Sequence, residues 1–539
     1  MKDWIPPPEE TRRPPHHVMR LERMGKSFPS RLSFLRTLLR RLGTEQARVT
    51  TSTWEMDAQG YGHAVLSVPL GGQTYSLIAL SQPLDAKDRS DRVIATQWDA
   101  AFGLVKGTPD AATLEMVRTQ APLQEAGQFD ARVLVLSRAN KSVRLWDHLV
   151  EALKNDQSPD ETLVADCGYL MRTTAVYGNG KFNIADRFEY AHNSGLEGPF
   201  MAEMLTVYLI RAFTHALIEH VAQKPLPRDL KRRLGIGNAT GLGMAPFLVS
   251  HPVLLNNWVM ARETALARVL AVSELSRDEI AELQRLYGQA TDHLEAWTVP
   301  DPVRMEEIKA LRAEWADFGS AFEQVTTPKA LYEAAAGYSE ELQELLVALL
   351  LEPFGHLIDG LEECMADPLG APPLDLSQDL QGAIARDWAW ALPIDFSSEA
   401  ETAQFWYTSE EKREPRIGQR YSEPGAELEN PLDIARRVQA FAQDLMAHQG
   451  DLEACLTAEP AHMMAAERVA LRARLPYSEI EDNLIAAGTQ PIDMLRFKLA
   501  FFGATGFDPK SDLWTRITLY QGAPLGDELG QYACPWLPV

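Results

Sequence analysis

The chain has 539 residues, of which 45% are hydrophobic and 24% charged, and its formal net charge is −23. This length is too great for one hydrophobic core, and the ordinary composition excludes a disordered or fibrous chain. The strong negative charge argues against partners such as nucleic acid or an anionic membrane surface. We therefore expect a folded, soluble protein of about three or four domains or subdomains.

The cysteines and the apolar segments bear on the location of the protein. The four cysteines lie far apart without a C-x-x-C pair, at Cys167, Cys364, Cys455 and Cys534. Free thiols of this kind are typical of a reducing cytosol, and the N-terminus lacks the apolar core of an export signal. Charged residues interrupt the longest apolar stretch, residues 200–222. We expect a cytoplasmic protein in which this stretch is a buried helix rather than a membrane span.

The N-terminal residues form a basic arm on an acidic protein. Residues 1–50 hold eleven Lys or Arg and five Asp or Glu, a net charge of +6, so the remainder carries −29. Such an arm is expected to pack against the acidic body of its own chain or of a second subunit. The alternative is a contact with phosphate or nucleic acid. A short basic helix is expected after the break at Phe28-Pro29.

The clearest β pattern follows the arm. Short segments rich in Val, Thr and aromatic residues are separated by glycines, which predicts a small antiparallel sheet. These segments are 48–56, 61–68 and 73–80, with further candidates at 92–98 and 102–105. Helices are then predicted at 112–120 and 143–154, with a strand at 132–136. Residues 169–177 and 181–190 are expected to form a hairpin around Gly178-Asn179-Gly180, because Asn-Gly favours a tight turn.

From residue 200 the pattern is helix after helix. Ser276 and Glu279 form a capping box, and amphipathic helices are predicted to about residue 297, over 305–322, over 327–353 and over 431–449. The predicted fold is therefore α+β, with a small antiparallel sheet in the N-terminal part followed by a larger, mostly helical, bundle-like part. We divide the chain into a basic arm, a sheet-containing domain, a helical domain, an irregular segment that is a lid or an interface, and a C-terminal helical segment with a loop-rich tail. Their ranges are 1–45, 46–198, 199–366, 367–430 and 431–539.

Standard cofactor motifs are absent. There is no P-loop, no H-E-x-x-H, no G-x-S-x-G and no zinc-type cysteine spacing. The glycine-rich stretch from Gly235 to Gly243 is preceded by a polar, helical-looking segment at 228–234 rather than by a buried strand, so it does not form a Rossmann fingerprint. The cofactor, if any, is not assigned by the sequence.

The same glycine-rich stretch is the first candidate site. We interpret it as a helix-entry loop whose backbone N–H groups bind an anion, with Gly237, Asn238 and Thr240 as binding residues. The alternative is that the glycines permit close packing of a helix against the sheet. The stretch is credible as an anion site only if the residues around Lys181 face it.

The predicted hairpin is the second candidate, because it concentrates ionisable groups on strands that otherwise look buried. Arg172 is a candidate for substrate binding, and Lys181 and Tyr177 for proton transfer. The alternative is an exposed hairpin with ordinary salt bridges.

Three weaker candidates remain. His215 and Glu219 have the i, i+4 spacing that metal ligands use, but a solvated or salt-bridged helix face is the favoured explanation, and no metal is assigned. Arg416 and Arg420 lie in a long polar segment that is suited to closing over an anionic substrate. His251 is a third candidate for proton transfer, next to Pro252.

These observations lead to one main hypothesis and two alternatives. The main hypothesis is an enzyme that acts on a small anionic metabolite, bearing carboxylate or phosphate, by proton transfer where the sheet-containing and helical parts meet; its reaction class is not assigned, and a homodimer is expected. The first alternative is a non-catalytic, oligomeric binding or scaffold protein that uses its basic arm. The second is a metal-dependent oxidoreductase with His and Glu ligands.

Overall fold

The computed structural model describes residues 12–85, 87–89, 97–178, 180–190, 193, 195–238, 252–298, 302–361, 374–397, 430–481, 496–497, 500–501, 503, 506–507 and 517–529. The chain divides into two compact units, each assembled from separate stretches. We call them the helical unit (Met1–Ser27, Ala245–Gln284 and Ala313–Phe497) and the sheet unit (Phe28–Met244, Arg285–Arg312 and Lys498–Val539). The α+β fold class predicted from the sequence is confirmed, with the sheet in the N-terminal part and many helices after it.

The described strands of the sheet unit form one nine-stranded sheet in the order β1-β2-β3-β4-β5-β6-β7-β9-β8. Neighbouring strands are antiparallel except for β6 and β7, which run parallel. The strands are β1 (Thr50–Met56), β2 (Gly62–Leu70), β3 (Gln73–Ser81), β4 (Ala100–Lys106), β5 (Val133–Lys141), β6 (Tyr169–Tyr177), β7 (Gly235–Asn238), β8 (Gly506–Phe507) and β9 (Ile517–Leu519).

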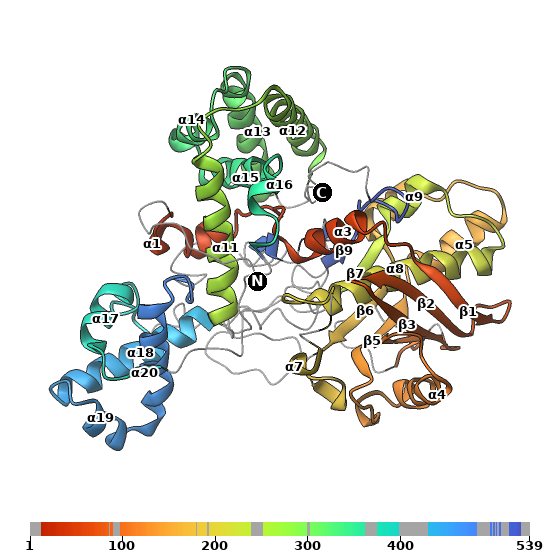
Figure 1. Ribbon diagram of the computed structural model, residues 1–539, viewed down its shortest axis with the longest axis horizontal. Helices are drawn as coiled ribbons and strands as arrows, with labels where there is room; N and C mark the ends of the chain where they lie inside the picture. The colour runs from red at the N-terminus through yellow and green to blue at the C-terminus, as the bar shows by residue number, and fades with distance from the viewer. Residues whose placement is uncertain are drawn as a thin grey trace. The chain divides into compact units, whose positions relative to one another are not determined.

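Helices cover both faces of this sheet (Figure 1). The long helix α8 (Met201–Ala222) packs on one face, where the rings of Phe102 and Phe213 meet edge to face with centroids 5.7 Å apart. On the other face, α4 (Ala111–Gln120) brings Val117 into a core with Ile78 and Leu136. The central strands β3, β4 and β5 between the two layers are therefore almost entirely buried, whereas β1 at the edge of the sheet is largely exposed.

The remaining helices of the sheet unit are α3 (Phe34–Thr44), α5 (Trp146–Lys154), α6 (Glu161–Cys167), α7 (Arg187–Tyr190) and α9 (Arg228–Arg233), with 3-10 turns η2 (Ala121–Ala126) and η3 (Lys181–Asn183). Local signals fix several of these boundaries. The Asp110 carboxylate caps α4 by accepting from the Thr113 amide, and Gly168 ends α6 in the left-handed region with φ 68°.

The helical unit has ten described helices of its own. They are α1 (Pro15–Val18), α2 (Leu21–Met24), α11 (Pro252–Leu270), α14 (Pro328–Ala334), α15 (Glu340–Leu350), α16 (Gly355–Ile358), α17 (Leu380–Asp387), α18 (Asn430–Ala447), α19 (Leu452–Ala458) and α20 (Met463–Arg474), with 3-10 turns η4 (Ala335–Gly337) and η6 (Pro460–His462). Helices α12 (Arg277–Ala296) and α13 (Pro302–Glu323) contribute residues to both units. Helices α17 to α20 share a core built around Trp388, Phe441 and Val469.

Most local predictions agree with the structure. The three strands predicted between residues 48 and 80 correspond to β1, β2 and β3, and the basic helix after Pro29 is α3. The capping box is present, because the Ser276 hydroxyl accepts from the Glu279 amide and the Glu279 carboxylate accepts from the Ser276 amide. The single helix predicted over 327–353 is wrong in one respect: the Ser339 hydroxyl caps a new start, so α14 and α15 are separate.

The predicted hairpin is wrong. Residues 169–177 do form a strand, β6, but it pairs with β5 on one edge and β7 on the other, so no edge remains for a hairpin partner. Beyond Gly180 the chain turns instead of extending, with Phe182 and Asn183 at φ 57° and 62°. Lys181 therefore lies on η3 rather than on a strand.

The start of the glycine-rich stretch also differs from the prediction. The helical segment before it is confirmed as α9, but Gly235 to Asn238 form strand β7 instead of a helix-entry loop. A Cβ atom at Gly235 would lie 2.4 Å from the Leu519 carbonyl oxygen, and one at Gly237 would lie 2.7 Å from the Tyr169 ring. These two glycines therefore allow close packing inside the sheet.

Helix α8 is the one helix in the described part of the chain that is long and apolar enough to cross a membrane by length and composition. Of its most apolar 18-residue window, 89% is buried inside the protein, which is how the core helix of a globular unit behaves. This burial agrees with the prediction of a buried helix.

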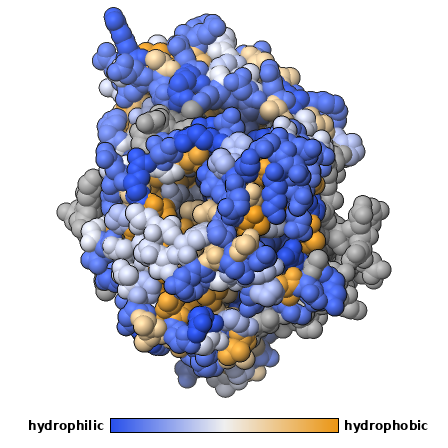
Figure 2. Space-filling model, turned by 90° about the vertical axis from the view of Figure 1, so that its right-hand side faces the viewer, coloured by the Kyte–Doolittle hydropathy of each residue, from blue (hydrophilic) through white to orange (hydrophobic). Residues whose placement is uncertain are grey.

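One face of the protein is drawn as a surface in Figure 2. On the face drawn in Figure 2 hydrophilic residues predominate, and hydrophobic side chains emerge in separate patches between them. Among the large hydrophobic residues of the described part of the sheet unit, Leu123 and Val143 are exposed. Isolated residues of this kind are normal on a protein surface.

Candidate functional site

Two of the predicted site elements lie side by side in the sheet unit. In the parallel pairing of β6 and β7, Arg172 lies opposite Gly237 and Thr173 lies opposite Asn238. The Asn238 amide nitrogen Nδ2 donates to the Thr173 hydroxyl over 2.7 Å, and both residues are fully buried. The side chain of Asn238 is therefore engaged inside the sheet, and Arg172 is the residue of this pair of strands that carries charge.

A second buried arginine lies on the neighbouring strand. Asn140 of β5 pairs with Arg172, and Arg138 comes two residues earlier on β5, so side-chain alternation places Arg138 and Arg172 on the same face of the sheet. Arg138 is 1% exposed and Arg172 is 2% exposed. The Arg138 guanidinium carbon lies 5.2 Å from the ring centroid of Trp98 and 5.4 Å from that of Phe182, which stabilises the cation through the ring faces.

The predicted proton-transfer residues Lys181 and Tyr177 lie near Arg138 rather than near the glycine-rich stretch. The Lys181 ammonium lies 5.8 Å from the ring centroid of Tyr177, and the Tyr177 and Phe182 rings meet edge to face at 4.9 Å. Phe182 contacts Arg138, so these side chains form one cluster. By contrast, Tyr177 comes four residues after Thr173, which places it about 13 Å along β6 from the pairing with Asn238.

The sequence pattern does not point to Arg138. It predicts an apolar strand over 132–136, whereas β5 continues through Ser137, Arg138, Asn140 and Lys141. The available signal was the direct continuation of an apolar strand into polar residues without a glycine or proline between them. Four further predicted residues, Thr240, His251, Arg416 and Arg420, lie outside the described residues.

His215 and Glu219, the candidate metal ligands, have other partners. Burial lowers the pKa of His215 well below its usual value, and the nearby charge of Arg211 lowers it further. The Glu219 carboxylate pairs with the Lys231 ammonium at 2.8 Å and accepts from the Leu226 amide. Within the described ranges, no group of three or more His, Cys, Asp or Glu side chains is arranged to hold a metal ion.

Arg211, on the same stripe of α8, is a central structural residue of the sheet unit. Its guanidinium is buried and donates to five backbone carbonyls, those of Lys231, Arg232, Leu234, Ala523 and Pro524. Burial lowers its pKa to about 10, against the opposing effect of Tyr208 and Tyr520. This one side chain therefore joins α8 to the chain around α9 and to the loop after β9.

Three arginines of the basic arm, Arg13, Arg20 and Arg23, are engaged within the helical unit. Arg13 donates to both carboxylate oxygens of Glu263 on α11 and also to Glu344 on α15, at 2.5 Å. Arg23 donates to Glu344 at 2.8 Å, and Arg20 pairs with Glu340. This part of the arm packs against the acidic body of its own chain, which is the first of the two arrangements that the charge pattern predicts.

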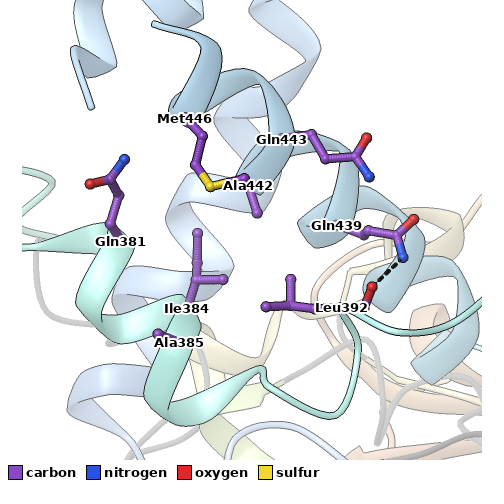
Figure 3. Close-up of a pocket in the computed structure, with 8 residues that line it drawn as sticks. All are labelled: Gln381, Ile384, Ala385, Leu392, Gln439, Ala442, Gln443 and Met446. Carbon is purple, nitrogen blue, oxygen red and sulfur yellow. Dashed lines mark hydrogen bonds between the residues drawn. The ribbon is translucent and has the colours of Figure 1, made fainter. Parts of the chain in front are cut away.

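The helical unit also has an apolar pocket of about 410 Å³ between α17 and α18. Ile384, Leu392 and Ala442 point into it, and Met446 lies at its edge (Figure 3). The Gln439 amide nitrogen closes one side by donating to the carbonyls of Leu392 and Ile394. The described residues that line this pocket include no charged side chain, so they supply no cation for binding an anion.

Comparison of the chain with known protein families, with curated proteins and with solved structures finds no match. A functional assignment therefore depends on the chemistry of the side chains described above.

Proposed function

We propose that the sheet unit binds a small anionic molecule, bearing carboxylate or phosphate, on the face of β5 and β6 that carries Arg138 and Arg172. The observation that supports this proposal is the burial of two guanidinium groups on one sheet face in a protein of net charge −23. Removing a guanidinium group from water costs free energy, and an anion bound beside it offsets that cost. A planar guanidinium also presents paired N–H groups that match a carboxylate or a phosphate.

The proposed chemistry is proton transfer by Lys181 or Tyr177, in an enzyme whose reaction class stays open. Arg138 is the arginine close to these two residues, because Phe182 contacts both Arg138 and Tyr177. Arg172 comes five residues before Tyr177, about 17 Å along the strand. We therefore assign Arg138 to orienting the anion next to the proton-transfer pair, and Arg172 to binding at the other end of the site. His251 remains a proposed third proton-transfer residue.

Anion binding is tested by thermal unfolding with inorganic phosphate, pyrophosphate and a set of mono- and dicarboxylates. At least one of these anions should raise the melting temperature of the wild type. The increase should be lost in Arg138→Gln and reduced in Arg172→Gln. Arg118→Gln is the matched control, since Arg118 lies exposed on α4 beside Glu115. The proposal is wrong if no anion stabilises the wild type, or if both variants respond like the control.

Proton transfer is tested separately in D₂O with whichever carboxylate binds. Mass spectrometry should detect deuterium at a carbon-bound position of that anion after incubation with the wild type, and much less after incubation with Lys181→Met or Tyr177→Phe. Binding without any exchange would support the anion site but contradict proton abstraction from a carbon of the anion by Lys181 or Tyr177.

The two alternative functions have less support from the contacts. Arg13, Arg20 and Arg23 of the basic arm already pair with carboxylates of their own chain. Their charges are therefore largely used within the protein rather than for binding a scaffold partner. His215 and Glu219 are similarly engaged with the residues around α9. The bundle-like packing of the later helices, the homodimer and the cytoplasmic location stay predictions of the sequence.

A further inference from the structure

A second group of buried polar side chains lies at the end of β3 and β5, on the opposite face of the sheet from Arg138. The Lys141 ammonium donates to the Ser81 hydroxyl oxygen over 3.2 Å, and these residues are 2% and 4% exposed. The ammonium also lies 5.2 Å from the ring centroid of Tyr61 and 5.5 Å from that of Trp146. Among the described residues, Ser81 is the one hydrogen-bond acceptor that Lys141 has, although an ammonium carries three donors.

The charges around Lys141 are of both signs. Asp99 is fully buried, and its carboxylate accepts from the Lys141 amide at 3.0 Å and pairs with the Arg89 guanidinium at 3.2 Å. Burial lowers the pKa of Lys141, as does Arg89, while Asp99, Asp147 and Asp57 oppose the shift. Because burial prevails, the neutral amine is favoured more than in an exposed lysine. A neutral amine accepts a proton, and the serine hydroxyl is the group placed to give one.

We propose that Ser81 is a nucleophile for acyl transfer and that Lys141 is its general base. A serine hydroxyl is a weak nucleophile until an adjacent base removes its proton, and a desolvated lysine is one of the bases that serve. Ser81 is the last residue of β3 and is itself buried, and the chain reaches the surface directly after it, because Gln82 and Pro83 are exposed. This activity is separate from the proposed anion site and does not depend on it.

The reaction balances with water as the co-substrate. The Ser81 oxygen forms a bond to the acyl carbon of an ester or amide, and its proton moves to the Lys141 nitrogen. The bond from the acyl carbon to the leaving group then breaks, and that group takes the proton from Lys141. Water attacks the acyl-serine, giving one proton to Lys141 and releasing the carboxylic acid, after which Ser81 recovers its proton from Lys141. Asp57, Asp99 and Asp147 make an uncharged acyl donor the preferred class.

The test uses the full-length protein and a fluorophosphonate probe, which forms a P–O bond with an activated serine and releases fluoride. Mass spectrometry should place the probe on Ser81 of the wild type, at up to one equivalent. Labelling should be absent in Ser81→Ala and at least tenfold slower in Lys141→Met. Ser76→Ala is the matched control, since Ser76 is a buried serine of the same strand that bonds to Ser67 and to the Gly107 carbonyl; it should label like the wild type.

The labelling rate should also rise with pH as Lys141 loses its proton. The pH at which the rate is half its maximum should lie below the pKa of a free lysine. The groups that set this midpoint are Lys141 itself, Asp57, Asp99, Asp147 and Arg89. The proposal is overturned if Ser81 of the wild type takes no probe, or if Lys141→Met labels within twofold of the wild type.

A second measurement covers the case in which Ser81→Ala fails to fold. In a Ser81→Cys variant, the rate of alkylation by iodoacetamide reports the thiolate. Its pH midpoint should be lower when Lys141 is present than in the Ser81→Cys, Lys141→Met double variant. Equal midpoints would show that Lys141 does not act on the side chain at position 81.

Discussion

In the helical unit, three arginines surround the buried carboxylate of Glu344, whereas in the sheet unit the buried ammonium of Lys141 has a serine hydroxyl as its acceptor. Burial by itself raises the pKa of Glu344, but the three positive charges outweigh it and hold this pKa well below its usual range. Burial lowers the pKa of Lys141, and no carboxylate among the described residues lies within ion-pair distance of its nitrogen. A buried cation whose donors are engaged by carboxylates or backbone carbonyls holds the fold together, whereas Lys141, with one acceptor among the described residues, is available for chemistry.

The largest effect is expected from breaking the arginine cluster around Glu344. Glu344→Gln leaves the guanidiniums of Arg13, Arg23 and Arg262 without their shared countercharge, and such a loss typically costs about 3–5 kcal/mol. Urea unfolding at pH 7 measures it. Glu333→Gln is the control, because Glu333 is an exposed residue of α14. A cost below about 1 kcal/mol for Glu344→Gln would mean that the cluster does not stabilise the helical unit.

Substitution of Arg211 tests whether the sheet unit also contains a buried cation with a purely structural role. Arg211→Met removes the donor shared by five backbone carbonyls and should destabilise the protein by about 3 kcal/mol. The same urea experiment measures this change. Arg228→Met, which removes an exposed ion pair with Asp527 near the same segment, should cost less than about 1 kcal/mol. Equal effects in both variants would contradict the structural role of the buried guanidinium.

The buried side chain of His215 should make the free energy of unfolding depend on pH, and the sign of that dependence follows from its pKa shift. The pKa of His215 is lowered by burial in the folded state, so below about pH 6.5 the unfolded chain binds a proton that the folded protein excludes. Stability is therefore lost as the pH falls from 7.5 to 5.5, by on the order of 1 kcal/mol from this residue. His215→Gln should lose that part of the pH dependence. An unchanged slope in the variant would show that His215 is not kept neutral.

The smallest effect is expected at the more exposed end of the arginine cluster. The Arg20 and Glu340 side chains pair, but they are 30% and 23% exposed. Solvent screens such a pair, so Arg20→Gln should cost less than about 1 kcal/mol at low salt, and still less at 0.5 M salt. A cost as large as that of Glu344→Gln would mean that proximity of opposite charges, rather than burial, decides the stability of the cluster.

The sequence predicted those features that depend on neighbouring residues. The strands β1 to β3, the helix α3 and the capping box of α12 follow from periodicity and from local hydrogen bonds, and the structure agrees. The predicted hairpin failed because strand pairing is not local. Strand β7, more than fifty residues after β6, occupies the edge where the hairpin partner was expected.

The site residues were harder to predict for the same reason. Arg172 was recognised because charge is unusual on an apolar strand, and its neighbour Gly237 came from the glycine-rich stretch. Arg138 and Lys141 gave no such signal, because basic residues after a short apolar run look like the start of a turn. Both side chains are buried because β5 extends as far as Lys141, which the short apolar run does not indicate.

The contrast between the two kinds of buried cation is tested most directly by removing one of each. Free energies of unfolding should be measured at pH 7 for Arg13→Met and Lys141→Met. Arg13→Met should lose about 3 kcal/mol, because it takes a countercharge from the buried carboxylates of Glu263 and Glu344. Lys141→Met should be as stable as the wild type or more stable, since a poorly satisfied cation is replaced by an apolar side chain of similar length. A comparable loss in both variants would contradict the account, because Lys141 would then be a structural cation like Arg13.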